Sequence, residues 1–195
     1  MAAGLRPERK MKMKLFHTGY SEIREPDLHF GRKNADFGQG FYMSFSDEFA
    51  GKWAKERNDK ETIVNSYELD TEGLNIKRFE RDEEWYEYIY RNRRGFEDKL
   101  ADTDVIIGPI AADTIYDTMG ILTSGLVGKE ESLHLLQYGK SYEQIVIKTD
   151  RAKRALRFLS SRVLDKAEIE KFREIVLNEE ADYQAFLAEE MDKMQ

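Results

Sequence analysis

A chain of 195 residues is long enough for one domain with a substantial core and a peripheral element. Hydrophobic residues make up 41% and charged residues 35%, which is typical of a globular protein and argues against disorder. The net charge of -7 disfavours a broad binding surface for duplex nucleic acid, and the absence of cysteine excludes disulfides, zinc–thiolate sites and a thiol nucleophile.

The ends of the chain differ from its middle. Residues 1–13 are basic and lack the apolar stretch of a secretory signal, so we expect a flexible leader. A single domain is expected over residues 14–160, followed by a helical C-terminal extension over residues 161–195. No apolar run approaches the length of a membrane span, which predicts no membrane association. A chain of this size without disulfides is typical of a reducing compartment, so we expect a cytoplasmic protein.

The first part of the domain predicts two short strands and a helix. Residues 15–17 form a strand that leads into a Thr–Gly turn, and residues 41–45 form a strand that is entered through two glycines. A helix begins at residues 46–48, where a polar cap precedes two acidic residues. Its apolar residues then repeat at helical spacing.

The rest of the chain mixes alternating and helical patterns. The expected elements are strands at 62–70 and 74–79, a helix at 82–93, a strand at 104–110, helices at 112–126 and 129–137, a strand at 142–148 and a helix at 151–160. A capping pair, Asp165 and Glu168, opens the tail, which forms either one long helix or two helices broken near residues 178–182. This order favours an α+β fold over a doubly wound sheet.

Two segments carry residue types that suit a ligand site. The first is Leu15-Phe16-His17-Thr18-Gly19, and the second spans residues 36–46, Asp-Phe-Gly-Gln-Gly-Phe-Tyr-Met-Ser-Phe-Ser. A strand glycine lets a ligand approach the main chain, and an aromatic ring offers a face for stacking. Each feature alone has a structural interpretation, namely a packed histidine, a turn glycine or an ordinary strand aromatic.

Together these segments resemble the poly(ADP-ribose) polymerase branch of the ADP-ribosyltransferases. His17-Thr18-Gly19 resembles its His–Gly element, with Thr18 in the place directly after the histidine, and Gly40-Phe41-Tyr42 resembles its Gly-x-Tyr element. Ser44-Phe45-Ser46 is similar to the Ser-Thr-Ser element of the arginine-specific and toxin branch. The resemblance implies an ADP-ribosyltransferase-like fold of two packed small antiparallel sheets with peripheral helices and a helical C-terminal tail.

The same resemblance implies that NAD is the substrate. His17 is expected to bond the adenosine-side ribose, the main chain beside Gly19 to bind the nicotinamide amide, and Tyr42 to stack on the nicotinamide ring. Arg32 lies in the loop where a pyrophosphate would pass. The residues expected to contact NAD are His17, Thr18, Gly19, Arg32, Phe37, Gly38, Gly40, Phe41, Tyr42 and Ser44.

The third catalytic element has three candidates. Tyr142-Glu143-Gln144-Ile145-Val146 resembles the polymerase segment that bears the catalytic glutamate, which points to Glu143. Successive strand residues face opposite sides, so only one of Glu143 and Gln144 can enter the cleft, and we favour Gln144. Asp113, at the mouth of an expected helix, is either a helix cap or the missing acid.

Residues 14–160 as a whole are more similar to the DUF3990 family of bacterial proteins, in which glutamine is typical at position 144. The shared features are Pro26-Asp27-Leu28, residues 36–42, Trp53-Ala54, Trp85, Asn92-Arg93, residues 108–113, Gln144-Ile145 and residues 155–159. His29 and His134 have no partner at metal-ligand spacing, so no metal site is expected.

Two classes of function therefore remain open. The first is an ADP-ribosyltransferase that modifies a protein, a nucleotide or a nucleic acid, or an NAD glycohydrolase if water is the acceptor. The resemblance implies a bacterial toxin or conflict-system effector with a small antitoxin-like protein partner. The second is a catalytically inactive nucleotide- or peptide-binding module on the same fold, because a neutral glutamine would replace the expected acid.

Overall fold

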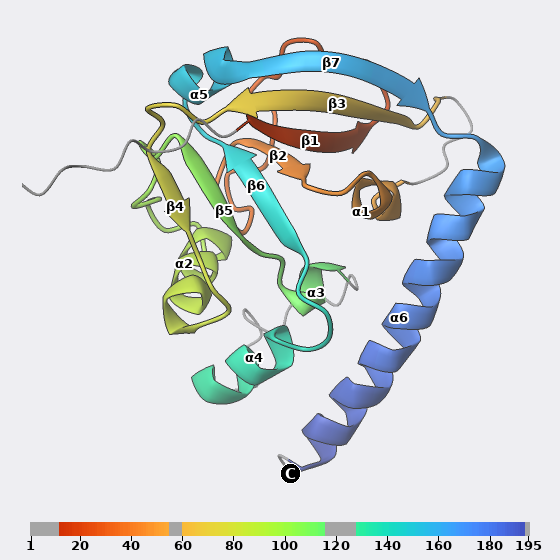
Figure 1. Cartoon of the computed structure of the whole chain (residues 1–195). Coiled ribbons are helices and arrows are strands. Elements are labelled where there is room, and N and C mark those ends of the chain that lie inside the picture. The colour runs from red at the N-terminus through yellow and green to blue at the C-terminus, as the bar shows by residue number, and fades with distance from the viewer. Residues whose placement is uncertain (1–11, 55–59, 116–127, 194–195) are drawn as a thin grey trace, which may run out of the picture.

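The computed structural model describes residues 12–54, 60–115 and 128–193, and the described strands form one seven-stranded sheet (Figure 1). The sheet order is β4-β5-β6-β2-β1-β3-β7. The strands are β1 (Lys12–Gly19), β2 (Phe41–Ser44), β3 (Ile63–Asp70), β4 (Ile76–Arg78), β5 (Val105–Pro109), β6 (Glu143–Ile147) and β7 (Leu156–Val163). The helices are α1 (Asp47–Lys52), α2 (Glu83–Arg93), α3 (Ala112–Ile115), α4 (Lys129–Leu136), α5 (Asp150–Ala155) and α6 (Lys166–Lys193). The expected α+β class is confirmed.

The sheet has two limbs where two separate sheets were expected. Strands β1, β3 and β7 form one antiparallel limb, and β2, β6, β5 and β4 form the other, with β4 parallel to β5. The limbs meet at the single pair Phe16↔Ser44 of β1 and β2. Strand β2 pairs along its whole length with β6 on one edge but only through its last residue with β1 on the other, and the limbs diverge from there. Figure 1 shows β1, β3 and β7 lying across the view, while β4, β5 and β6 lie steeply, between the top and the bottom of the view.

The core lies on both faces of the β5–β6 pair. Ile107 and Ile145 face one cluster, which they share with Leu15, Phe41 and Tyr67. The intervening residues of these strands face the second cluster, which contains Phe37, Phe79, Trp85, Tyr88, Ile89, Ile106 and Val146. This alternation is the two-residue period of a strand, and burial on both faces explains the continuous apolar runs. Helix α2 covers the second face and presents Trp85 and Ile89 to it.

The segment after β6 differs from the helix expected at residues 151–160. Helix α5 ends at Ala155, and β7 follows at once as an edge strand paired with β3. Leu156 and Phe158 pack on the core, while Arg157 between them is exposed and pairs with Glu68. The prediction was wrong here because β7 is largely exposed and its alternation is short.

Two expected boundaries also shift. Strand β1 begins at Lys12, inside the range assigned to the leader, and β7 continues to Val163, beyond residue 160. Helix α3 spans Ala112–Ile115, and the remainder of the helix expected to residue 126 lies outside the described residues.

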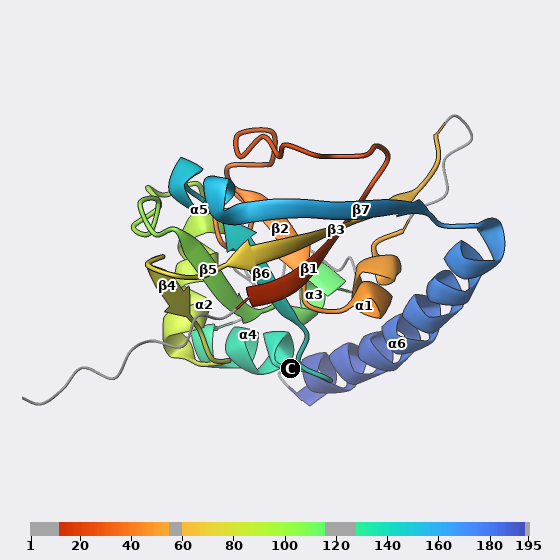
Figure 2. The same cartoon turned by 45° about the horizontal axis from the view of Figure 1, so that its top comes forward.

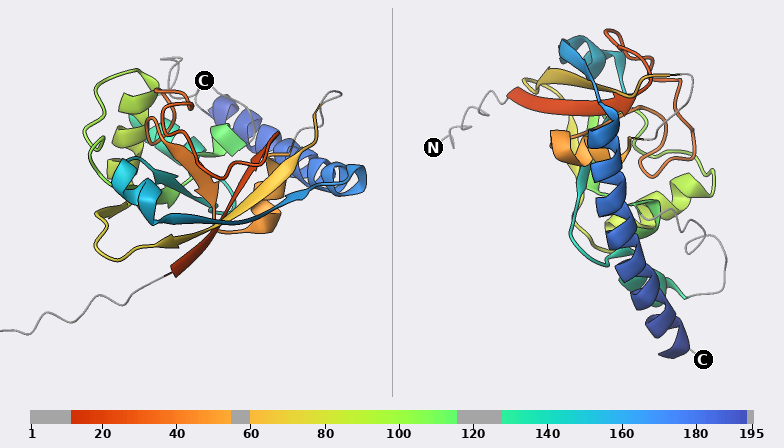
Figure 3. Two further views of the ribbon diagram at one scale, coloured as in Figure 1. Left: turned by 90° about the horizontal axis from the view of Figure 1, so that it is seen from above. Right: turned by 90° about the vertical axis from the view of Figure 1, so that its right-hand side faces the viewer.

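Helix α6 is continuous, so the one-helix alternative holds. It runs from the end of β7 past α1 toward α4 (Figures 1 and 2). The right-hand view of Figure 3 shows α6 passing beside α1. Near its start, Phe172 packs with Ala50 of α1. Near its end, Tyr183 and Phe186 cluster with Ala112 of α3. Among the described residues, no helix is both long and apolar enough to cross a membrane.

Candidate functional site

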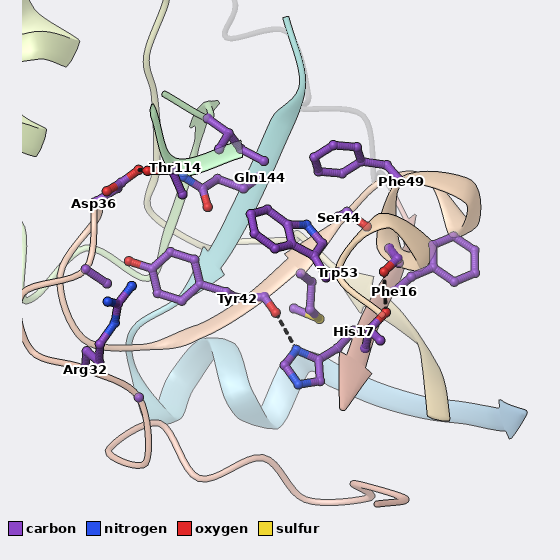
Figure 4. A pocket seen from close by; sticks show the side chains of 16 residues that line it. Phe16, His17, Arg32, Asp36, Tyr42, Ser44, Phe49, Trp53, Thr114 and Gln144 are labelled. Atoms are coloured by element: carbon purple, nitrogen blue, oxygen red, sulfur yellow. Dashed lines mark hydrogen bonds between the residues drawn. The ribbon is translucent and has the colours of Figure 1, made fainter. Parts of the chain in front are cut away.

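A cavity of about 330 Å³ opens where the two limbs of the sheet meet. Its walls come from β1, the loop before β2, β2 itself, α1, the segment after β5, and the start of β6 (Figure 4). The volume lies within the range of small-molecule sites. The lining residues are Phe16, His17, Thr18, Gly31, Arg32, Ala35, Asp36, Tyr42, Met43, Ser44, Phe49, Ala50, Trp53, Ile110, Thr114 and Gln144.

His17 is fixed in one tautomer. Its Nδ1 lies 2.7 Å from the main-chain oxygen of Tyr42, as Figure 4 shows. A carbonyl oxygen only accepts, so Nδ1 carries the proton and Nε2 keeps its lone pair. The imidazole also packs against the Phe41 ring at a tilt of 35°, with ring centroids 4.5 Å apart. Burial lowers the pKa of His17, which favours the neutral ring. The neutral ring of His17 therefore keeps a hydrogen-bond acceptor at Nε2.

Tyr42 presents its ring to the cavity and anchors its hydroxyl in the loop that precedes β2. The phenol donates to the main-chain oxygen of Gly38 at 2.7 Å and accepts from the main-chain N–H of Phe37 at 3.0 Å. Burial and the nearby negative charge of Asp36 raise the pKa of the phenol, so it stays neutral. With both ends held, the ring face has a fixed position on the cavity wall.

Glu143 and Gln144 take opposite sides of β6. Gln144 is 8% exposed and lines the cavity, whereas Glu143 is exposed and lies in a separate surface depression with Lys52 and Tyr142. The buried Nε2 of Gln144 has no hydrogen-bond partner among the described residues. A buried amide without a partner costs free energy unless a ligand or water satisfies it.

A buried ionic network forms the wall beside Tyr42. Arg93 Nε donates to Asp36 Oδ1 at 2.8 Å, and Thr114 Oγ1 donates to Asp36 Oδ2 at 3.1 Å. Arg93 Nη2 in turn donates to Thr114 Oγ1 at 2.6 Å. Asp36 and Thr114 line the cavity, and Arg93 lies behind them.

The opposite wall and the rim are aromatic and basic. Phe49 and Trp53 of the α1 region meet edge to face at 6.0 Å, and Trp53 is 41% exposed. Arg32 is exposed on the loop before β2 and has no ion-pair partner among the described residues. Thr18 donates its hydroxyl to the main-chain oxygen of Ala50, which ties β1 to α1.

Some residues expected to contact NAD lie behind the cavity wall. Phe37 and Phe41 are core residues, and Gly19 lies beside the His17 ring without lining the cavity. Gly38 has a φ of 76°, and a Cβ there would lie 2.1 Å from Asp98 Oδ2. At Gly40 a Cβ would lie 2.6 Å from the main-chain oxygen of Ile147, so this glycine permits the close approach of β2 and β6.

Other expected residues line the cavity: His17, Thr18, Arg32, Tyr42, Ser44 and Gln144. Ser44 donates its hydroxyl to the main-chain oxygen of Ser46, which itself caps α1. The main chain of Asp113 belongs to α3, but its side chain lies outside the described residues.

The sequence did not assign Asp36, Phe49, Trp53 or Thr114 to the site. Asp36 lies inside the second motif, and Trp53 is one of the features shared with the DUF3990 family, so the sequence could have indicated both as site residues. Phe49 and Thr114 carried none, because an apolar helix residue and a threonine after a strand are common everywhere. In the described part of the chain, no cluster of three or more histidine, aspartate or glutamate side chains could hold a metal ion.

The geometry defines an α+β protein with a small-molecule cavity lined by aromatic and polar side chains at the junction of two sheet limbs. Residues 13–158 match the family model described as "Protein of unknown function (DUF3990)". The chain belongs to this DUF3990 family. No curated protein and no solved structure gives a significant match.

Proposed function

We propose that the protein is an NAD-dependent ADP-ribosyltransferase that cleaves the nicotinamide–ribose bond and transfers ADP-ribose to a protein, nucleotide or nucleic-acid acceptor. One observation carries the proposal. His17 of β1, Tyr42 of β2 and Gln144 of β6 come from three neighbouring strands and line one cavity. The resemblance to ADP-ribosyltransferases assigns substrate roles to His17 and Tyr42. It places the third catalytic residue in the segment that contains Glu143 and Gln144, of which Gln144 lines the cavity.

The proposed binding mode follows from the exposed groups of the cavity. The Tyr42 ring stacks on the nicotinamide, and His17 Nε2 accepts a hydrogen bond from a ribose hydroxyl. The cavity holds the nicotinamide and its ribose, and the pyrophosphate continues toward Arg32 at the rim. Arg32 suits this role because a guanidinium pairs well with phosphate oxygens.

The proposed chemistry builds positive charge on the ribose. As the bond to nicotinamide breaks, its electron pair leaves with the ring, and the acceptor then adds to the ribose and loses a proton. Gln144 would bond a ribose hydroxyl and hold the sugar in place without contributing charge. A role as a bacterial toxin or conflict-system effector, with a small antitoxin-like protein partner, is proposed on the resemblance alone.

The test is release of free nicotinamide from NAD by the purified protein, with Tyr42→Ala as the matched variant. We expect release by the parent and a loss of at least about tenfold in the variant, since ring stacking and positioning are both removed. Release without an added acceptor would identify a glycohydrolase. NAD binding without release, with or without candidate acceptors, would favour the inactive binding module, which the neutral Gln144 supports. Full activity in a folded Tyr42→Ala variant would contradict the assignment.

A further inference from the structure

The cavity contains a carboxylate that the sequence did not single out. Of the described residues that line it, Asp36 alone carries a carboxylate. Glu143 lies on the other side of β6, and Gln144 is neutral. Asp36 is 8% exposed, so its charge acts in a region that is partly shielded from water.

The partners of Asp36 hold its carboxylate in one orientation. Arg93 donates to Oδ1 and Thr114 donates to Oδ2, at 2.8 Å and 3.1 Å. The side-chain amide of Asn92 donates to the main-chain oxygen of Asp36 at 3.0 Å and fixes the same residue from a second side. Each carboxylate oxygen can accept more than one hydrogen bond, so capacity for a ligand remains.

The ion pair is directional. Asp36 and Thr114 line the cavity, whereas Arg93 stands behind them, in contact with Asp36 but not among the lining residues. The pair therefore presents its negative end to the cavity and its positive end to the protein.

We infer that Asp36 is the negative group that faces the cationic half of NAD, selects the oxidised dinucleotide over NADH and stabilises the ribose cation. This inference rests on the proposed function. When the glycosidic bond breaks, the electron pair goes to the ring nitrogen, the nicotinamide becomes neutral and the positive charge passes to the ribose. Asp36 exchanges no proton and forms no covalent bond. The acceptor adds to the ribose carbon and releases its proton to solvent.

The experiment compares the affinities for NADH and for a carbocyclic NAD analogue, which keeps the cationic ring but cannot be cleaved. Calorimetry on the parent and on Asp36→Asn gives the ratio of the two dissociation constants. We expect the parent to prefer the cationic analogue and Asp36→Asn to reduce that preference by about tenfold. A loss of shape alone would weaken both ligands alike and leave the ratio unchanged. If Asp36→Asn does not fold, the double variant Asp36→Asn/Arg93→Gln removes both charges and the same ratio is measured.

The rate of nicotinamide release provides the second readout. Asp36→Asn should raise KM for NAD by about tenfold, because the carboxylate also faces the cationic ring of bound NAD, and should lower kcat as well, because the carboxylate stabilises the ribose cation of the transition state. An unchanged affinity ratio and an unchanged kcat, in a parent that releases nicotinamide through Tyr42, would overturn the role of Asp36 and leave the proposed function standing. A parent that binds neither dinucleotide would overturn both.

Discussion

The Nδ1–H of His17 donates a hydrogen bond to the main-chain oxygen of Tyr42, 2.7 Å away. This bond crosses between β1 and β2 near their single paired position, Phe16↔Ser44. It joins the two limbs of the sheet at the cavity and sets the tautomer of His17 at the same time. The residue that holds the junction therefore also lines the cavity and keeps a lone pair on Nε2.

Acid should destabilise the protein through His17. Burial lowers its pKa below the ordinary value of 6.5. As the pH falls below about 6.5, the unfolded chain takes up a proton that the folded protein does not, so the free energy of unfolding decreases. Urea denaturation at about pH 7 and about pH 5 should show a smaller decrease in the free energy of unfolding for His17→Gln than for the parent. The exposed His29 gives the control variant, His29→Gln, and equal losses in His17→Gln and His29→Gln would contradict this prediction.

Neighbouring residues of β6 should differ sharply in their effect on activity. Gln144→Leu keeps the approximate size of the side chain but removes the amide that is proposed to bond the ribose, so we expect nicotinamide release to fall by at least about tenfold. Glu143→Gln changes the adjacent residue, which faces the other side, and should leave release within about twofold of the parent. Equal effects of the two substitutions would contradict the assignment of Gln144, and not Glu143, to the functional cavity.

Two glycines with the same backbone conformation should respond differently to alanine. Gly38 and Gly95 have φ values of 76° and 74°, but only Gly38 has atoms that a Cβ would strike. Gly95→Ala should cost about 1 kcal/mol for the left-handed conformation alone. Gly38→Ala should cost more than about 3 kcal/mol, because the largely buried Asp98–Lys148 ion pair must also move. Chemical denaturation measures both, and a similar cost would contradict the crowding at Gly38.

Tyr42→Phe should separate stability from ring stacking. The variant keeps the ring but leaves the main-chain N–H of Phe37 and the oxygen of Gly38 without their phenol partner, which should cost about 1–3 kcal/mol of unfolding free energy. Nicotinamide release should fall less than in Tyr42→Ala, since the stacking face remains. Denaturation midpoints and initial rates on the three proteins check both parts. Equal rates in Tyr42→Phe and Tyr42→Ala would show that the hydroxyl, not the ring, carries the function.

The sequence predicted most elements, because their patterns are local. The alternation in β3 and β6 and the spacing of apolar residues in α2 were sufficient. The prediction failed at β7. Leu156 and Phe158 give an alternating pattern of only two apolar residues, which is too short to outweigh the helical pattern of residues 151–160. It also implied two sheets, since the single pair Phe16↔Ser44 that joins the limbs has no sequence pattern.

The candidate site was predictable where a motif residue itself reaches the cavity. His17, Tyr42 and Gln144 are such residues. Asp36 was not assigned, since its partners Arg93 and Thr114 are 57 and 78 residues away in the chain. Only the fold brings these three groups together, and the same holds for Phe49 and Trp53, whose position on the wall depends on how α1 docks.

Helix α6 determines how short a working fragment of this protein can be. The match to the family ends at residue 158, in the middle of β7. Two contacts of the cavity walls nevertheless come from α6, beyond that boundary. Glu179 is ion-paired with Lys52 of α1 at 2.7 Å, and Tyr183 packs on Ala112 of α3, the helix that contains Thr114. Cutting the chain at residue 158 would split the edge strand β7. It would also remove α6, the brace that contacts α1 and α3 behind two walls of the cavity. A fragment meant to retain the cavity should therefore extend through Phe186, the last residue of that brace.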